Sequence, residues 1–232
     1  KNRKKLNDKY KYDTIIDIIR YDDSSALQTI ISSEVNFDYE KKYDFIFDFT
    51  DLLPKKATIF ELTIYFNSVN CYMYVMSNHI KPKEISKKET KLLLANVPKF
   101  AFASGNSEMI RFCEQNKILS KTDYSIYLDI SIAYQNNHLY TWLFENFHTN
   151  ITENSPKLAI ISNNVSILSD LIYDFGANLN SALFQAFDND NIEILSFLIQ
   201  LKSSNINYGM SGINIFIDLY SSYSSCCYRR KN

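Results

Sequence analysis

The chain has 232 residues, of which 46% are hydrophobic and 22% are charged, and its formal net charge is −1. This composition excludes global disorder and gives no overall electrostatic attraction to nucleic acid or to an anionic membrane. Only 4 glycines and 4 prolines are present, which is too few turn residues for a meander of many short strands. The sequence therefore favours a folded helical protein.

The N-terminal residues 1–12 are basic and polar, and no apolar segment follows them. They lack the apolar core of a secretory signal, and we expect a frayed, solvated end there. Contact of these lysines with nucleic acid or acidic lipid is the weaker alternative. No apolar stretch reaches the roughly 18–20 residues that span a bilayer, so no membrane span is expected.

The four cysteines are of two kinds. Cys71 and Cys113 fall on apolar faces of predicted helices, where a small buried hydrophobe is the expected use. Cys226 and Cys227 are adjacent in a Ser- and Tyr-rich tail, a spacing that suits neither a redox CxxC motif nor a zinc site. We therefore expect a reduced, intracellular setting, the cytoplasm, and neither a metal nor a cofactor.

One pattern repeats along the chain: an apolar run, a polar turn, and a second apolar run at helical spacing. Two weaker copies come first, at Thr14–Ser33 and Thr58–Asn78, and clearer copies follow at Phe100–Gln115, Ser131–Asn146, Leu158–Asn180 and Leu183–Gln200. Apolar residues at i, i+3, i+4 and i+7 give each helix one buried stripe. Because such units bury their apolar faces against their neighbours, the predicted fold is all-α, a solenoid of stacked helix-turn-helix repeats.

The polar turns align the copies with one another. They are Asp22-Asp23, Asn67-Ser68, Gly105-Asn106, Asn137-His138, Asn163-Asn164 and Asp190-Asn191. Between the second residues of these turns the spacings are 45, 38, 32, 26 and 27 residues. An alanine precedes several turns by about four residues, at Ala101, Ala133, Ala159 and Ala186. Such a small residue lets paired helices approach closely, and the polar turn supplies the N-cap of the second helix.

The spacings also predict the domain organisation. The longer first intervals leave room for inserts, of which residues 39–56 are the clearest. We expect one repeat domain over residues 13–207 that contains this insert. Residues 208–232 are predicted to hold a partial last unit, including the apolar run Ile213–Leu219, and a low-complexity tail.

Several of these segments resemble ankyrin repeats. Gly105–Ile110 and Asp190–Leu195 are similar to the central G-H/N-x-E-[VI]-[VI] motif, Ser155-Pro156 takes the place of Thr-Pro, and Phe175–Asn180 resembles the closing x-G-A-D/N-[VIL]-N. The stretch from residue 60 to residue 207 resembles the ankyrin-like domain of unknown function that precedes ankyrin arrays in flagellate-protist proteins. The Thr-Pro-Leu-His tetrapeptide is missing from the other copies, and the long fingers are reduced. The resemblance implies a protein-interaction role and brings no catalytic residues.

No constellation in the sequence indicates an enzyme. The histidines His79, His138 and His148 are not paired with other ligands, and His138 is expected to be a turn residue. Asp44, Asp48 and Asp51 are spaced to share one face of a helix, for which a solvated acidic face is the favoured interpretation over an acid–base or metal cluster. Nucleotide-binding and hydrolase motifs are also missing from the sequence.

The 17 tyrosines suggest where a partner would bind, because aromatic residues favour interfaces as well as cores. Tyr134, Tyr140 and Tyr173, with His138, are the candidate partner-binding residues, and a purely structural use of the tyrosines is the alternative. The sequence thus predicts a non-catalytic scaffold for an unknown protein partner. The alternative function is a cap or spacer for a longer ankyrin array.

Overall fold

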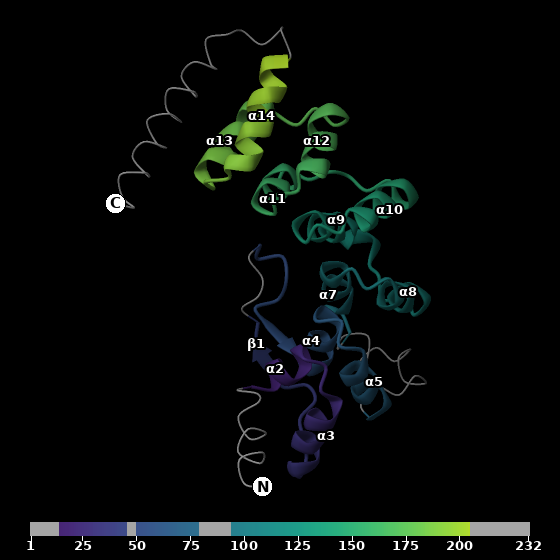
Figure 1. The fold of residues 1–232 in the computed structure, drawn as a ribbon. Helices are drawn as coiled ribbons and strands as arrows, with labels where there is room; N and C mark the ends of the chain where they lie inside the picture. Colours follow the sequence, from purple (N-terminus) through teal and green to yellow (C-terminus); the bar gives the residue numbers. More distant parts are fainter. Residues whose placement is uncertain (1–13, 46–49, 79–93, 205–232) are drawn as a thin grey trace, which may run out of the picture. The chain divides into compact units, whose positions relative to one another are not determined.

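The computed structural model describes residues 14–45, 50–78 and 94–204 (Figure 1). The chain divides after Thr152 into two compact units, and each unit is described by itself below. This boundary falls inside the single domain predicted over residues 13–207. The predicted frayed end at 1–12 and the partial last unit at 208–232 lie outside the described residues.

The described residues are mostly helical, as the sequence predicts. The first unit contains α2 (Ile15–Arg20), α3 (Ser24–Ser33), β1 (Lys42–Asp44), β2 (Lys56–Thr58), α4 (Ile59–Tyr65), α5 (Val69–Asn78), α7 (Val97–Ser104), α8 (Ser107–Gln115), the 3-10 turn η2 (Lys121–Asp123), α9 (Tyr124–Ala133) and α10 (Asn137–Phe147). The second unit contains α11 (Ser155–Ile161), α12 (Val165–Tyr173), α13 (Leu179–Asp188) and α14 (Ile192–Ser204).

These helices form successive pairs, α2–α3, α4–α5, α7–α8 and α9–α10 in the first unit and α11–α12 and α13–α14 in the second (Figure 1). The first helices of neighbouring pairs contact one another: α2 contacts α4, α4 contacts α7, α7 contacts α9, and α11 contacts α13. Apolar side chains in the middle of four of these helices are buried, namely Leu62, Phe100, Ile130 and Leu158. Burial of these side chains is the main stabilising contribution to both units.

The same turn joins the two helices of every pair. One residue adopts a left-handed conformation, with φ between 52° and 71°, at Asp22, Asn67, Gly105, Gln135, Asn163 and Asp190. The backbone N–H of the following residue donates to the carbonyl five residues earlier, on Ile18, Thr63, Ala101, Ser131, Ala159 and Ala186 respectively. This geometry satisfies carbonyls at the end of the first helix. The residue after the left-handed position directly precedes the first residue of the second helix.

The fourth turn lies two residues earlier than the sequence alignment places it. The left-handed residue is Gln135, and Asn136 takes the position assigned to His138. Asn136 lies 30 residues after Asn106 and 28 before Asn164, so the last three spacings are more regular than predicted. The equivalent small residue is Ser131 rather than Ala133, and His138 lies in the first turn of α10.

The insert at 39–56 is not a helix in its described part. Lys42 pairs with Thr58 and Asp44 with Lys56 in a two-stranded antiparallel ladder. Asp44 is thus a strand residue, whereas Asp51 has a left-handed φ of 57°, so these two carboxylates do not share a helix face. Asp48 lies outside the described residues.

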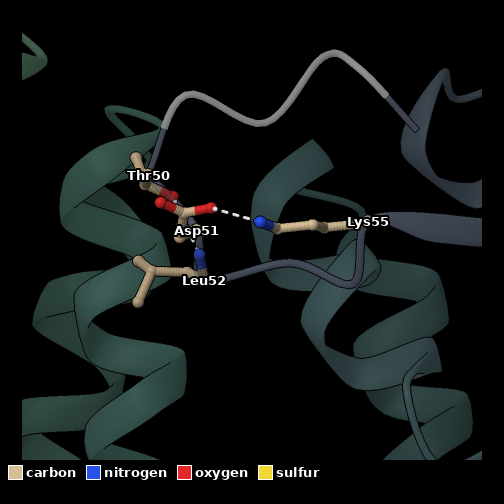
Figure 2. Close-up of polar contacts among 4 residues, drawn as sticks. All are labelled: Thr50, Asp51, Leu52 and Lys55. Atoms are coloured by element: carbon tan, nitrogen blue, oxygen red, sulfur yellow. Dashed lines mark hydrogen bonds and ion pairs between the residues drawn. The ribbon is translucent and has the colours of Figure 1, made fainter. Parts of the chain in front are cut away.

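The tip of this insert is held by local contacts (Figure 2). The Leu52 backbone N–H donates to the Thr50 hydroxyl at 3.3 Å, and the Lys55 ammonium lies 3.8 Å from the Asp51 carboxylate. Both charged side chains are exposed, so their ion pair adds little stability. The main anchor of the insert is Phe45, whose N–H donates to the Lys55 carbonyl at 2.7 Å and whose ring is buried.

Candidate functional site

Five aromatic residues gather along one edge of the first unit. Phe45, Tyr65, Phe66, Phe100 and Tyr134 form this aromatic edge. The ring of Tyr65 is central: its centroid lies 4.8 Å from that of Phe45, 5.1 Å from Phe66, 6.3 Å from Phe100 and 6.1 Å from Tyr134. All four contacts are edge-to-face, an arrangement that the quadrupoles of aromatic rings favour.

Separate elements supply the members of the aromatic edge. Phe45 follows β1, Tyr65 and Phe66 stand at the end of α4, Phe100 lies within α7, and Tyr134 caps the end of α9. Tyr65 and Phe66 lie just before the left-handed turn that follows α4, and Tyr134 lies just before the one that follows α9; α7 contacts both of these helices. The insert contributes the remaining ring through its strand pairing with β2.

Burial divides the aromatic edge into a base and a rim. Phe45 and Phe100 are buried, whereas Tyr65, Phe66 and Tyr134 are only partly covered. The rim therefore offers apolar ring surface, together with phenolic groups that can donate or accept hydrogen bonds. Because its rings pack on a buried base, a partner that binds there would immobilise few additional side chains.

The structure separates the four predicted binding residues. Tyr134 lies on the aromatic edge, and His138 is exposed in α10. Tyr173 is 62% exposed, at the end of α12 in the second unit. Tyr140 in α10 is only 5% exposed, and its role as a partner-binding residue stays a prediction.

The sequence patterns single out neither Tyr65 nor Phe45 as part of a site. The copy Thr58–Asn78 is so rich in aromatic and β-branched residues that periodicity does not single out Tyr65. Phe45 lies in the insert, where no repeat pattern applies. Tyr65 stands two residues before the left-handed residue of its turn and Tyr134 stands one residue before, so the two tyrosines share no repeat position that the sequence could have indicated.

The buried groups that could react are held in unreactive states. Cys71 and Cys113 are both buried, as the sequence predicts. Burial raises the pKa of each thiol to about 12, and at Cys71 the Asp22 carboxylate adds to the effect. Because the thiolate is the nucleophile and metal ligand, these cysteines are poor reactive groups at neutral pH.

The parts of the chain that the structure describes contain neither a candidate metal site nor a candidate membrane-spanning helix. No group of three or more His, Cys, Asp or Glu side chains there could hold a metal ion. None of the helices in these parts is both long and apolar enough to cross a bilayer.

Two carboxylates are buried inside the first unit. Asp129 in α9 accepts a hydrogen bond from the Thr152 hydroxyl at 2.7 Å. Glu61 is 2% exposed and forms a capping box at the start of α4, in which its carboxylate accepts from the Thr58 backbone N–H at 2.7 Å. Burial raises the pKa of the Glu61 carboxyl, although hydrogen bonds from Thr58, the charge of Lys42 and the Asn96 side chain lower it.

This raised pKa predicts a pH-dependent effect of Glu61→Gln on stability. As the pH rises through the ordinary carboxyl range, Glu61 ionises in the unfolded chain before it does so in the fold, and the folded state loses stability. Glutamine keeps the capping box but does not ionise. We expect the variant to gain stability relative to the parent between pH 4 and pH 8, by roughly 1 kcal/mol.

Urea denaturation across this pH range would measure the difference. Glu145→Gln, at an exposed position of α10, is the matched control for the loss of a carboxyl at the surface. A Glu61→Gln variant that becomes less stable than the parent as the pH rises would show that the ionised carboxylate stabilises the fold.

Comparisons of the chain with models of known protein families, with curated proteins and with solved structures found no match.

Proposed function

We propose that this chain is a non-catalytic protein-interaction scaffold, built from stacked, degenerate ankyrin-like helix pairs. The repeated left-handed turn and the contacts between successive first helices support this arrangement. A stack of this kind keeps its surface side chains in fixed positions, so binding requires little ordering of the scaffold.

The observation that carries the proposal is the aromatic edge. Its rim of Tyr65, Phe66 and Tyr134 lies over a buried aromatic base, and tyrosine is among the residues enriched at energetically important interface positions. The partner surface that fits is apolar with hydrogen-bonding groups at its margin, since the partly covered rings of Tyr65 and Tyr134 each carry a polar hydroxyl.

The test compares partner capture by two double variants. Tyr65→Ser with Tyr134→Ser alters the rim, and Tyr21→Ser with Tyr173→Ser alters two exposed tyrosines outside the aromatic edge. We expect proteins retained from native lysate by the parent to be retained by the second variant. The rim variant should lose them by at least about tenfold, which corresponds to 1.4 kcal/mol of binding free energy.

Matched helical circular dichroism is required before the comparison, because a variant that unfolds would lose partners for a trivial reason. If the folded rim variant retains the same proteins as the parent, the aromatic edge is not the binding face. If both folded variants lose them equally, the loss does not depend on the rim and the assignment also fails.

A further inference from the structure

The strand β1 has an outer edge that does not take part in its ladder with β2. Within this antiparallel pairing, the Phe45 N–H donates to the Lys55 carbonyl at 2.7 Å. Residues that bond across such a ladder alternate with residues whose backbone N–H and carbonyl point the other way. Tyr43, two residues before Phe45, therefore bonds to β2, whereas Lys42 and Asp44 direct their backbone groups away from β2.

The two outer edges of this small sheet differ. On β2, the N–H of Thr58 also points outward, and it donates to the Glu61 carboxylate at 2.7 Å in the cap of α4. On β1, the backbone groups of Lys42 and Asp44 form no hydrogen bond with any other described residue, and both side chains are exposed. A strand edge with unpaired N–H and carbonyl groups can pair with another strand.

The sequence of β1 is complementary to itself. If two copies run antiparallel with Tyr43 of one opposite Tyr43 of the other, Lys42 of each copy lies opposite Asp44 of the other. The outward N–H and carbonyl groups of these residues then bond to one another, and each opposed pair carries opposite charges, which stabilises a cross-strand pair.

The charges also select this register among the alternatives. A shift of one strand by two residues in either direction again brings outward backbone groups together, but it places Lys42 opposite Lys42 or Asp44 opposite Asp44. Like charges directly opposite one another destabilise a strand pair. A lysine at a strand edge likewise hinders pairing with strands that lack a matching carboxylate, so a second copy fits this edge better than an arbitrary peptide.

Contacts within the sheet continue the same arrangement. The Lys56 ammonium of β2 lies 3.5 Å from the Asp44 carboxylate of β1. In the paired copies, Asp44 would lie between Lys56 of its own chain and Lys42 of the second copy. On the opposite face, the partly covered Tyr43 would meet Tyr43 of the second copy at a position where opposed Cα atoms are about 4.5 Å apart.

We propose that a second copy of this chain pairs with the outer edge of β1, antiparallel and centred on Tyr43, to form one sheet with two strands from each copy. The contact is symmetric, because the same edge serves both copies. Strands of three residues bury little area, so we expect a weak dimer with a dissociation constant between about 1 μM and 1 mM. The inference goes beyond the proposed function and uses neither the aromatic rim nor the stacking of helix pairs.

Analytical ultracentrifugation of the full chain at low salt, over this concentration range, tests the proposal. The parent should show a monomer–dimer equilibrium. Lys42→Glu places two carboxylates opposite each other at both ends of the contact, and Asp44→Lys places two ammonium groups there. Each variant alone should weaken self-association by at least about tenfold. Lys55→Glu makes the same charge change at an exposed site off the β1 edge, and it should leave the dissociation constant unchanged.

A mixture of the two single variants separates pairing from misfolding. In a dimer of one Lys42→Glu chain with one Asp44→Lys chain, the new glutamate faces the new lysine, and Asp44 of the first chain faces Lys42 of the second. An equimolar mixture should therefore associate about as strongly as the parent, although neither variant associates alone.

Three results would overturn the proposal. They are a parent that stays monomeric at about 1 mM, single variants that associate as strongly as the parent, and folded single variants whose mixture stays monomeric. Helical circular dichroism that matches the parent shows that each variant is folded. Partner capture through the aromatic edge is measured with other variants, so its failure leaves this result unaffected.

Discussion

Asn136→Asp is expected to destabilise the chain by about 3 kcal/mol at pH 7, a large effect for a substitution that barely changes side-chain shape. The Asn136 amide nitrogen donates to the carbonyls of Phe102 at 2.8 Å and Ala103 at 3.0 Å. Both carbonyls lie near the end of α7, in the preceding helix pair. Asn136 is therefore a link between two consecutive helix pairs.

Aspartate removes both hydrogen bonds, each of which contributes about 1 kcal/mol. The new carboxylate also faces two carbonyl oxygens at the negative end of a helix dipole, which adds about 1 kcal/mol of repulsion. Urea denaturation followed by circular dichroism would measure the change in the free energy of unfolding.

Asn146→Asp is the matched control for this prediction. The Asn146 side chain is exposed and donates only to the Trp142 carbonyl of its own helix, at 2.9 Å. Its substitution should cost no more than about 1 kcal/mol. If the two variants are destabilised equally, the contact between α7 and Asn136 does not hold the pairs together.

Asn136 also shows where sequence reasoning about the turns reaches its limit. Five of the six turns are predicted correctly, because Asn, Asp or Gly at the left-handed position carries a low steric penalty. At the fourth turn the segment Gln135-Asn136-Asn137-His138 offers several polar residues, and the left-handed residue is Gln135. The hydrogen bonds from Asn136 to α7 fix the position of this turn. The local conformational preferences of residues 135–138 do not encode these bonds.

The strand pairing within the insert and the aromatic edge were not predicted, for a related reason. Strands β1 and β2 have three residues each, which is too short for a period-two pattern to be read from the sequence. Their pairing depends on contacts across the intervening loop. The rings of Phe45, Tyr65 and Tyr134 meet because three elements converge, and their separation in the sequence gives no indication of this.

Gly105→Ala is the second substitution with a large expected effect, about 2–3 kcal/mol of destabilisation. Gly105 has φ of 71°, a left-handed conformation in which a Cβ costs about 1–2 kcal/mol. A Cβ at this position would also lie 2.8 Å from the Asn136 side-chain oxygen, which is closer than real contacts allow. The Asn136 side chain would have to move, and its bonds to α7 would weaken.

Gly176→Ala separates the backbone strain from this clash. Gly176 has nearly the same φ, 69°, but no heavy atom lies within 4 Å of the position its Cβ would take. Its substitution should therefore cost only the strain, about 1–2 kcal/mol. Equal destabilisation of the two variants in urea denaturation would show that the Asn136 contact contributes nothing.

A double-mutant cycle between Gly105→Ala and Asn136→Ala then tests the coupling directly. Asn136→Ala removes the side chain that the new Cβ would meet, so the double variant should be less destabilised than the sum of the single variants, by at least about 1 kcal/mol. Additive effects would place the cost of Gly105→Ala in the backbone alone. A coupled result would instead show that glycine is required at this turn because the next helix pair reaches back across it to α7.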